Sequence, residues 1–185
     1  MSKIYLSKES ALLVIDVQDK LLPAMPEEDR ALCLKATNTL LALAHELGTR
    51  IVYTEQYPKG LGPTEPGLLE ALKSSAAIRV EKMTFDACLA PEFHTQLIEL
   101  PHQIVVCGME AHICVLATVR ALIERRHQVI VPFDAVVSRR PAYRDNGLEQ
   151  MRVAGATITN HESLVFDALR SAEHPAFKRF SKMIR

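Results

Sequence analysis

Three residues with reactive side chains, Asp16, Lys82 and Cys114, stand at or just beyond the ends of apolar runs of the sequence. Asp16 closes the run ALLVI, Lys82 follows AIRVE, and Cys114 comes six residues after IVVCG. A cysteine is a nucleophile, a carboxylate can accept its proton, and an ammonium favours the ionised forms of both. If the chain brings the three into one crevice, they have the chemistry that acyl transfer requires.

Each of the three also has a plainer interpretation. Asp16 could cap a helix or a turn, Lys82 could be a solvated residue at a strand exit, and Cys114 could fill the core, since buried cysteines are common. Only their coincidence in space favours a reactive site. The elements that carry them therefore decide the interpretation.

Apolar runs alternate with helix-like segments along the whole chain. The runs predict strands at about residues 11–17, 50–55, 77–82, 102–108, 127–133 and 156–160. The other segments predict helices at about 27–48, 68–73, 91–100, 113–126, 141–154 and 162–170, with a last short helix near the carboxyl terminus. The breaker-rich segment 56–67 predicts the longest loop, which makes it a candidate functional segment.

This alternation predicts an α/β fold, with helices on both faces of a parallel sheet, three layers in all, and residues 1–185 as a single domain. Ligands bind such sheets beyond the carboxyl ends of the strands, where the strand order reverses. We therefore expect Asp16, Lys82 and Cys114 to meet there. Cys114 also lies at the start of the helix predicted at 113–126, where backbone N–H groups stabilise a thiolate. Together with Lys82 this predicts a thiol pKa below the usual ~8.5, an effect that a nearby Asp16 opposes.

The composition narrows the range of functions. Twenty-two basic residues balance twenty-two acidic ones, which argues against a dedicated nucleic-acid surface, since phosphate contacts require clustered Lys and Arg. No apolar run reaches the ~18–20 residues of a membrane helix, and the first residues lack the apolar core of a secretory signal. We expect a soluble, cytoplasmic protein with no membrane partner.

The four cysteines include no C-x-x-C pair, which predicts free thiols in a reducing compartment. Cys33 and Cys107 are expected in the core. Cys88 is closer to the predicted site and is a candidate redox partner of Cys114.

The segments ALLVIDVQ, EKMTF, GMEAHICVLATVRAL and DAVVSR resemble the isochorismatase-like cysteine hydrolase family, and the likeness runs through almost the whole chain. The resemblance implies a Rossmann-like, six-stranded parallel sheet between helices, with Asp16, Lys82 and Cys114 as the catalytic triad. It also implies a cis peptide bond between Met109 and Glu110, which aims the backbone N–H of Glu110, beside that of Cys114, at one oxygen as an oxyanion hole. Finally, it implies a homo-oligomer of at least two chains.

Within that family the sequence departs from the two best-known branches. The segment TEQYPKGLG has no histidine where nicotinamidases carry metal-binding histidines, and Cys114 is a residue that true isochorismatases lack. We therefore expect no metal and no cofactor. The likeness is greatest to a branch that includes bacterial hydrolases of unknown substrate and eukaryotic proteins, some of them described as ribonucleases.

Other residues are candidates for a substrate pocket because of their positions near the predicted strand ends: Gln18, Leu21, Gln56, Tyr57, Phe85 and His112. His112 could instead bond to the backbone of its turn. The side chain of Glu110 could either meet a polar group of the substrate or pair with an arginine.

The leading hypothesis is a metal-independent cysteine hydrolase that cleaves a small amide or a related C–N bond through a thioester on Cys114. One alternative is a ribonuclease, for which RNA would be the partner and a basic groove the expected feature. The other is a non-catalytic interaction module, for which a blocked pocket would be the expected feature.

Overall fold

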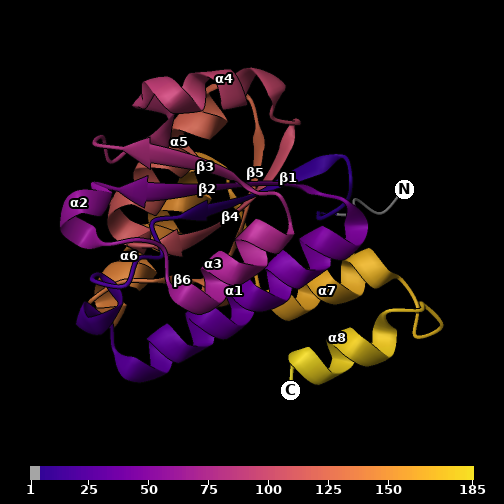
Figure 1. Ribbon diagram of the computed structural model, residues 1–185. Helices are drawn as coiled ribbons and strands as arrows, with labels where there is room; N and C mark the ends of the chain where they lie inside the picture. The colour runs from indigo at the N-terminus through magenta and orange to yellow at the C-terminus, as the bar shows by residue number, and fades with distance from the viewer. Residues whose placement is uncertain (1–4) are drawn as a thin grey trace.

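A parallel β-sheet forms the centre of the structure, a computed structural model that describes residues 5–185. Its six main strands lie in the order β3-β2-β1-β4-β5-β7 (Figure 1). They are β1 (Ser10–Ile15), β2 (Arg50–Gln56), β3 (Ile78–Lys82), β4 (Gln103–Met109), β5 (Gln128–Pro132) and β7 (Thr157–Thr159). A two-residue strand, β6 (Val136–Val137), pairs in parallel with the end of β4. The predicted α/β class and six-stranded parallel sheet are confirmed.

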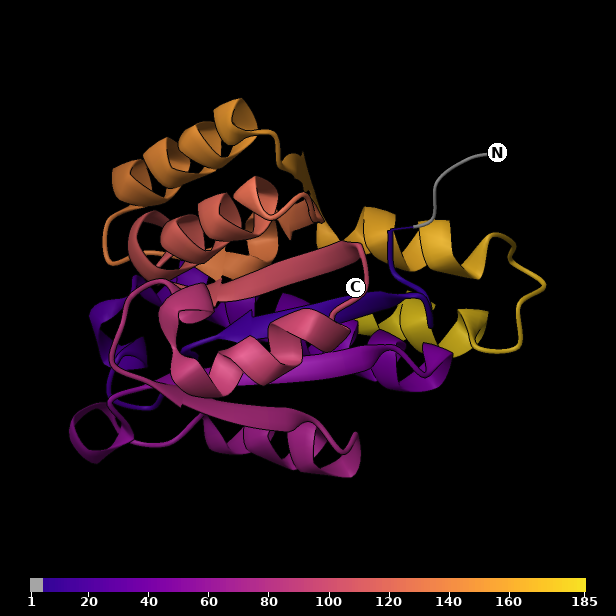
Figure 2. The ribbon, with the colours of Figure 1, turned by 90° about the horizontal axis from the view of Figure 1, so that it is seen from above.

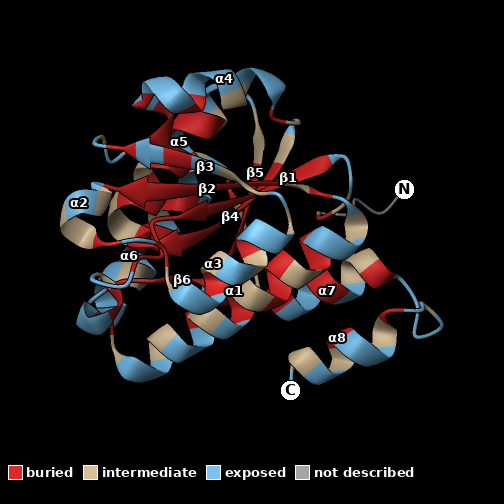
Figure 3. Cartoon of the chain, in the orientation of Figure 1, coloured by how far each residue is buried: buried red, intermediate tan, exposed pale blue. Residues whose placement is uncertain are grey.

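The middle of the sheet is buried on both faces (Figure 3). All six residues of β1 are buried, which explains why its sequence is a nearly continuous apolar run and not an alternating one. The edge strand β3 does alternate, since Arg79 and Glu81 are exposed while Val80 is buried. Burial thus distinguishes the central strands from this edge.

Helices cover both faces of the sheet, as predicted. One face carries α1 (Glu27–Leu47), α3 (Pro66–Ser74), α7 (His161–Leu169) and α8 (Phe177–Met183), and the other carries α4 (Pro91–Glu99), α5 (Leu116–Glu124) and α6 (Pro141–Ala154). Figure 1 shows α1, α7 and α8 together on one side of the sheet, and Figure 2 shows α5 and α6 side by side. Each layer of helices buries its own cluster of apolar side chains against the sheet. Over residues 5–185, no helix combines the length and the apolar character needed to cross a membrane.

The helix ends mostly follow the sequence signals, with two differences. α1 begins with acidic residues and stops at Gly48, whose φ of 66° lies in the left-handed region. The loop predicted at 56–67 contains a one-turn helix, α2 (Pro58–Leu61), which a proline starts. The helix predicted at 113–126 is preceded by a π-turn over Ala111–Val115, so α5 itself begins later than predicted.

The strand order reverses between β1 and β4. From β1 the chain moves outward to β2 and β3, and it then returns to place β4 on the other side of β1. Asp16 directly follows β1, and Cys114 lies in the π-turn after β4. Both therefore emerge at the point of the sheet where open α/β folds bind ligands.

Candidate active site

Asp16 is held by residues of β2 and β3, which both lie on one side of β1 in the sheet. Its φ of 51° lies in the left-handed region, which aspartate tolerates better than most residues. Its Oδ2 accepts a hydrogen bond from Lys82 Nζ at 2.6 Å, and its Oδ1 accepts one from Thr54 Oγ1 at 2.6 Å. Its backbone N–H donates to the carbonyl of Thr54 at 3.1 Å. The carboxylate is therefore fixed in one orientation.

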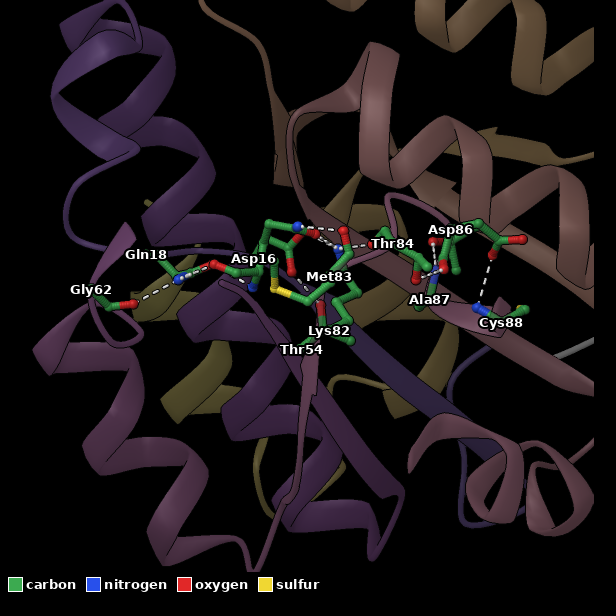
Figure 4. A network of polar contacts seen from close by, with 12 residues as sticks. Asp16, Gln18, Thr54, Gly62, Lys82, Met83, Thr84, Asp86, Ala87 and Cys88 are labelled. Atoms are coloured by element: carbon green, nitrogen blue, oxygen red, sulfur yellow. Dashed lines mark hydrogen bonds and ion pairs between the residues drawn. The ribbon is translucent and has the colours of Figure 1, made fainter. Parts of the chain in front are cut away.

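The Lys82 ammonium directs its N–H groups at three oxygen atoms. Nζ donates to Asp16 Oδ2 at 2.6 Å, to Gln56 Oε1 at 2.8 Å and to the carbonyl oxygen of Thr84 at 3.2 Å. The side chains of Lys82 and Asp16 are 0% and 1% exposed, and Figure 4 shows them at the centre of the polar network. A buried ion pair persists only when hydrogen bonds replace the lost hydration, as they do here.

Cys114 completes this cluster from the π-turn after β4. It is 7% exposed, whereas each of the other three cysteines is 0% exposed. Burial and, after it, the carboxylate of Asp16 raise the pKa of the Cys114 thiol to about 12, although the ammonium of Lys82 lowers it. The predicted pKa below the usual value is therefore wrong, because the loss of hydration and the carboxylate outweigh the ammonium. The structure nevertheless brings the three predicted residues together.

Two glycines let the backbone pack closely around the Cys114 turn. Gly108 has a φ of 119°, and a Cβ at this position would collide with the backbone of Ile15 where β4 runs beside β1. On the other side, a Cβ at Gly147 of α6 would lie 2.9 Å from the carbonyl oxygen of Ala111. Neither close approach is compatible with a larger residue.

Glu110, at the start of the turn, pairs with an arginine, one of the two roles that the sequence left open. The peptide bond that links it to Met109 is cis. Its Oε1 accepts from Arg139 Nη2 at 2.6 Å, and its Oε2 accepts from the Arg139 backbone N–H at 2.9 Å. Burial alone would raise the pKa of Glu110, but the hydrogen bonds and charge of Arg139 outweigh it and lower that pKa. The pair ties the turn to the segment that follows β6.

His112 also bonds to the segment after β6. Its Nδ1 lies 3.0 Å from Ser138 Oγ, and its ring packs against that of Tyr143 with the centroids 5.0 Å apart. The partner is thus a side chain, where the sequence suggested the backbone or the substrate.

Three of the proposed pocket residues serve the framework of the site. Gln18 donates to the carbonyl oxygens of Gln56 and Gly62, at 3.0 and 2.6 Å, so both of its amide protons are used. Leu21 packs against the apolar cluster on the α1 side of the sheet. Gln56 bonds to Lys82 and, through its Nε2, to the carbonyl oxygen of Met83 at 2.9 Å.

A cavity of about 430 Å³ lies beside this network. Lys82 and the predicted pocket residue Tyr57 line it, whereas Asp16, Cys114 and Phe85 do not, and Phe85 is 62% exposed. Its two lysines are matched by two glutamates, so it is not a basic groove. The lining residues are Tyr57, Pro58, Lys59, Glu81, Lys82, Met83, Thr84, Ala90, Pro91 and Glu92.

Glu55, the acidic residue of the segment TEQYPKGLG, has a structural role. Glu55 accepts hydrogen bonds from the N–H and the hydroxyl of Thr64, at 2.7 and 2.8 Å, and forms an ion pair with Arg79 at 2.6 Å. In the part of the chain that the structure describes, no three His, Cys, Asp or Glu side chains gather as a ligand set for a metal.

Sequence reasoning missed three partners of the site. Thr54 lies opposite Ile15 in the register of β1 and β2, so a prediction of that register would have placed it beside Asp16. Thr84 contributes only a carbonyl oxygen, which no sequence pattern marks. Arg139 stands in the segment DAVVSR, but nothing in the sequence pairs it with Glu110.

The fold has three layers, and a thiol, a carboxylate and an ammonium meet at the switch point of its sheet. This arrangement is the one expected of the isochorismatase-like hydrolases. The model of the Isochorismatase domain matches residues 10–163. The chain belongs to the isochorismatase family.

Similar proteins cover nearly the whole chain. Isochorismatase domain-containing protein 2A of Mus musculus is 34% identical over 97% of this chain and 84% of its own length. A solved Caenorhabditis elegans structure, described as the MAR1 ribonuclease, has a TM-score of 0.84 and 34% identity over 97% of this chain and 91% of that one. The YcaC protein of Escherichia coli, described as an octameric hydrolase of unknown specificity, has a TM-score of 0.85 at 18% identity over 100% of this chain and 96% of its own. At that identity the likeness shows the fold alone.

Proposed function

We propose that the protein is a metal-independent cysteine hydrolase that cleaves a small amide or a related C–N bond through a thioester on Cys114. The observation that carries the proposal is a buried cluster of three side chains. Asp16 and Lys82 form an ion pair in it, and the charges of both act on the Cys114 thiol. These are the nucleophile, the proton acceptor and the fixed positive charge that acyl transfer requires.

In the first half of the reaction, Cys114 passes its proton to Asp16 as the sulfur attacks the substrate carbonyl carbon. The negative charge that develops on the carbonyl oxygen is stabilised by the backbone N–H groups of Glu110 and Cys114. When the C–N bond breaks, the leaving nitrogen takes the proton from Asp16 and departs as an amine. A thioester on Cys114 is left.

In the second half, water attacks the thioester carbonyl and gives a proton to Asp16. The C–S bond then breaks, the proton returns to sulfur, and a carboxylic acid leaves. Lys82 neither gains nor loses a proton in this cycle. It holds Asp16 in place and balances its charge.

The test is a screen of small amides, ureides and carbamates in which mass spectrometry follows amine release and the intact mass of the protein. The wild type should turn over at least one compound and carry an acyl adduct on Cys114. Cys114→Ala should be inactive and folded, and Cys88→Ala should serve as the matched control with activity retained. Full activity in Cys114→Ala, or an adduct on another residue, would contradict the proposal.

RNA cleavage is a second candidate, favoured by the Caenorhabditis elegans relative that is described as a ribonuclease. The equal numbers of acidic and basic residues argue against it. Incubation of a labelled RNA with the wild type and with Cys114→Ala decides the matter. Cleavage by the wild type that Cys114→Ala abolishes would replace the amide hypothesis.

A further inference from the structure

The contacts of the Lys82 ammonium single out Gln56. An ammonium has three N–H donors, and the three acceptors around Nζ are a carboxylate, a backbone carbonyl and the Gln56 side-chain carbonyl, at 2.6, 3.2 and 2.8 Å. Asp16 belongs to the proposed reaction, and Thr84 contributes only its backbone. Among the residues that the structure describes, Gln56 is therefore the one side chain that holds Lys82 without an assigned role.

The Gln56 amide is fixed in the orientation that Lys82 needs. Its Nε2 donates to the carbonyl oxygen of Met83 at 2.9 Å, so its Oε1 must face the ammonium. Its backbone N–H donates to Gln18 Oε1 at 2.8 Å, and its backbone carbonyl accepts from Gln18 Nε2 at 3.0 Å. Gln18 and Gln56 are 0% and 8% exposed. The acceptor is thus pre-oriented and shielded from water.

We propose that Gln56 is a positioning residue of the active site, which holds the Lys82 ammonium against Asp16 by supplying one of its three oxygen acceptors. The inference rests on the proposed function but concerns a residue that acts only through Lys82. It follows that a charge introduced at residue 56 changes how readily Cys114 loses its proton.

Two substitutions test this in opposite directions. Gln56→Glu keeps the shape but places a carboxylate beside the ammonium, which adds negative charge near the thiol and disfavours its ionisation. Gln56→Met keeps the length but removes the oxygen, so one N–H of Lys82 is released and can donate to the thiolate. The control is Gln96→Glu. It adds the same charge beside Arg50, whose guanidinium donates to Gln96 Oε1 at 2.7 Å. Arg50 starts the strand that Gln56 ends, about 20 Å away at the rise of a β-strand.

The readout is the rate of Cys114 alkylation by iodoacetamide, followed peptide by peptide between pH 7 and 10. A rise of about one unit in the thiol pKa slows this reaction about tenfold at fixed pH. We expect Gln56→Glu to be about tenfold slower than the wild type, Gln56→Met to be several-fold faster, and Gln96→Glu to match the wild type. Thermal unfolding verifies that each variant is folded.

A purely structural role for Gln56 gives a different result, since loosening of the site would speed alkylation in both variants. Equal acceleration in both, or no difference between Gln56→Glu and Gln96→Glu, would overturn the inference. If Gln56→Met does not fold, the comparison of the two glutamate variants still decides it. The labelling needs no substrate, so failure of this inference is distinguishable from failure of the proposed function, which the screen of small amides tests separately.

Discussion

Lys82→Met tests the central ion pair most directly, because it removes the charge while keeping nearly the same length and volume. Lys82 Nζ and Asp16 Oδ2 are 2.6 Å apart, and the two side chains are 0% and 1% exposed. Removal of one partner of such a buried pair leaves the other charge without compensation and costs about 3–5 kcal/mol. We expect that loss in the free energy of unfolding at pH 7, measured by urea denaturation. At roughly 2–4 °C per kcal/mol for a chain of this size, the melting temperature should fall by roughly 6–20 °C.

The double variant Asp16→Asn/Lys82→Met shows whether the loss comes from the unpaired charge. It removes both charges, so it should recover most of the stability that Lys82→Met loses. Lys73→Met is the control, since Lys73 pairs with Glu70 on the surface at 4.0 Å and its side chain is 65% exposed. Its stability should hardly change. A loss below about 1 kcal/mol in Lys82→Met, or no recovery in the double variant, would refute the reasoning about a buried, mutually dependent pair.

Three further predictions follow from the site and its surroundings. Iodoacetamide should label Cys114 faster than the other three cysteines, because it alone has any exposed surface, and its rate should rise about tenfold per pH unit up to its pKa of about 12. Arg139→Met should lower the free energy of unfolding at neutral pH. It should also make that free energy change less as the pH falls into the acidic range. The pKa of Glu110 is depressed from its usual 4.5. The stability that the ionised Glu110 gains from Arg139 is therefore fully present above pH 4.5, and it is lost as the pH falls through the folded-state pKa. Sedimentation in dilute buffer should give a homo-oligomer of at least two chains.

Each of these has a result that would contradict it. Equal labelling of all four cysteines in the folded protein would show that the exposure of Cys114 does not set its reactivity. An Arg139→Met variant with an unchanged acid-unfolding curve would show that the pair does not stabilise the turn. A sedimentation mass near 20.6 kDa would show a monomer.

The fold could be predicted from the sequence because its central strands are buried on both faces, which requires long apolar runs. β1 and β4 are such runs, and the helices between strands carry their own start and stop signals, such as Gly48 after α1. The switch-point rule then places Asp16 and Cys114 together without knowledge of any distance. The loop at 56–67 was less predictable, since a helix of one turn leaves almost no periodic pattern.

The surroundings of the triad were less predictable because they depend on register and depth. Thr54 reaches Asp16 only because Ile15 and Thr54 are partners in the sheet, and a shift of two residues would have removed the contact. Their positions make Gln18 and Gln56 candidates for the substrate pocket, but their amides bond to the backbone and to Lys82. Position near a strand end shows that a residue is close to the site, but it does not show where the side chain points.

The prediction of a lowered pKa for the Cys114 thiol is wrong for a similar reason. The sequence indicates which charges lie nearby, but it does not show how much water is excluded from the thiol. The raised pKa still agrees with a nucleophilic role for Cys114. It describes loss of the proton to solvent, which leaves the cluster of thiolate, carboxylate and ammonium with a net charge of −1 in a buried place. Transfer of the same proton to Asp16 leaves the net charge at zero before and after, so burial penalises it far less. A deeply buried ion pair beside a neutral thiol therefore suits a reaction in which the proton moves only when the sulfur attacks, and the network around Lys82 keeps that acceptor in place.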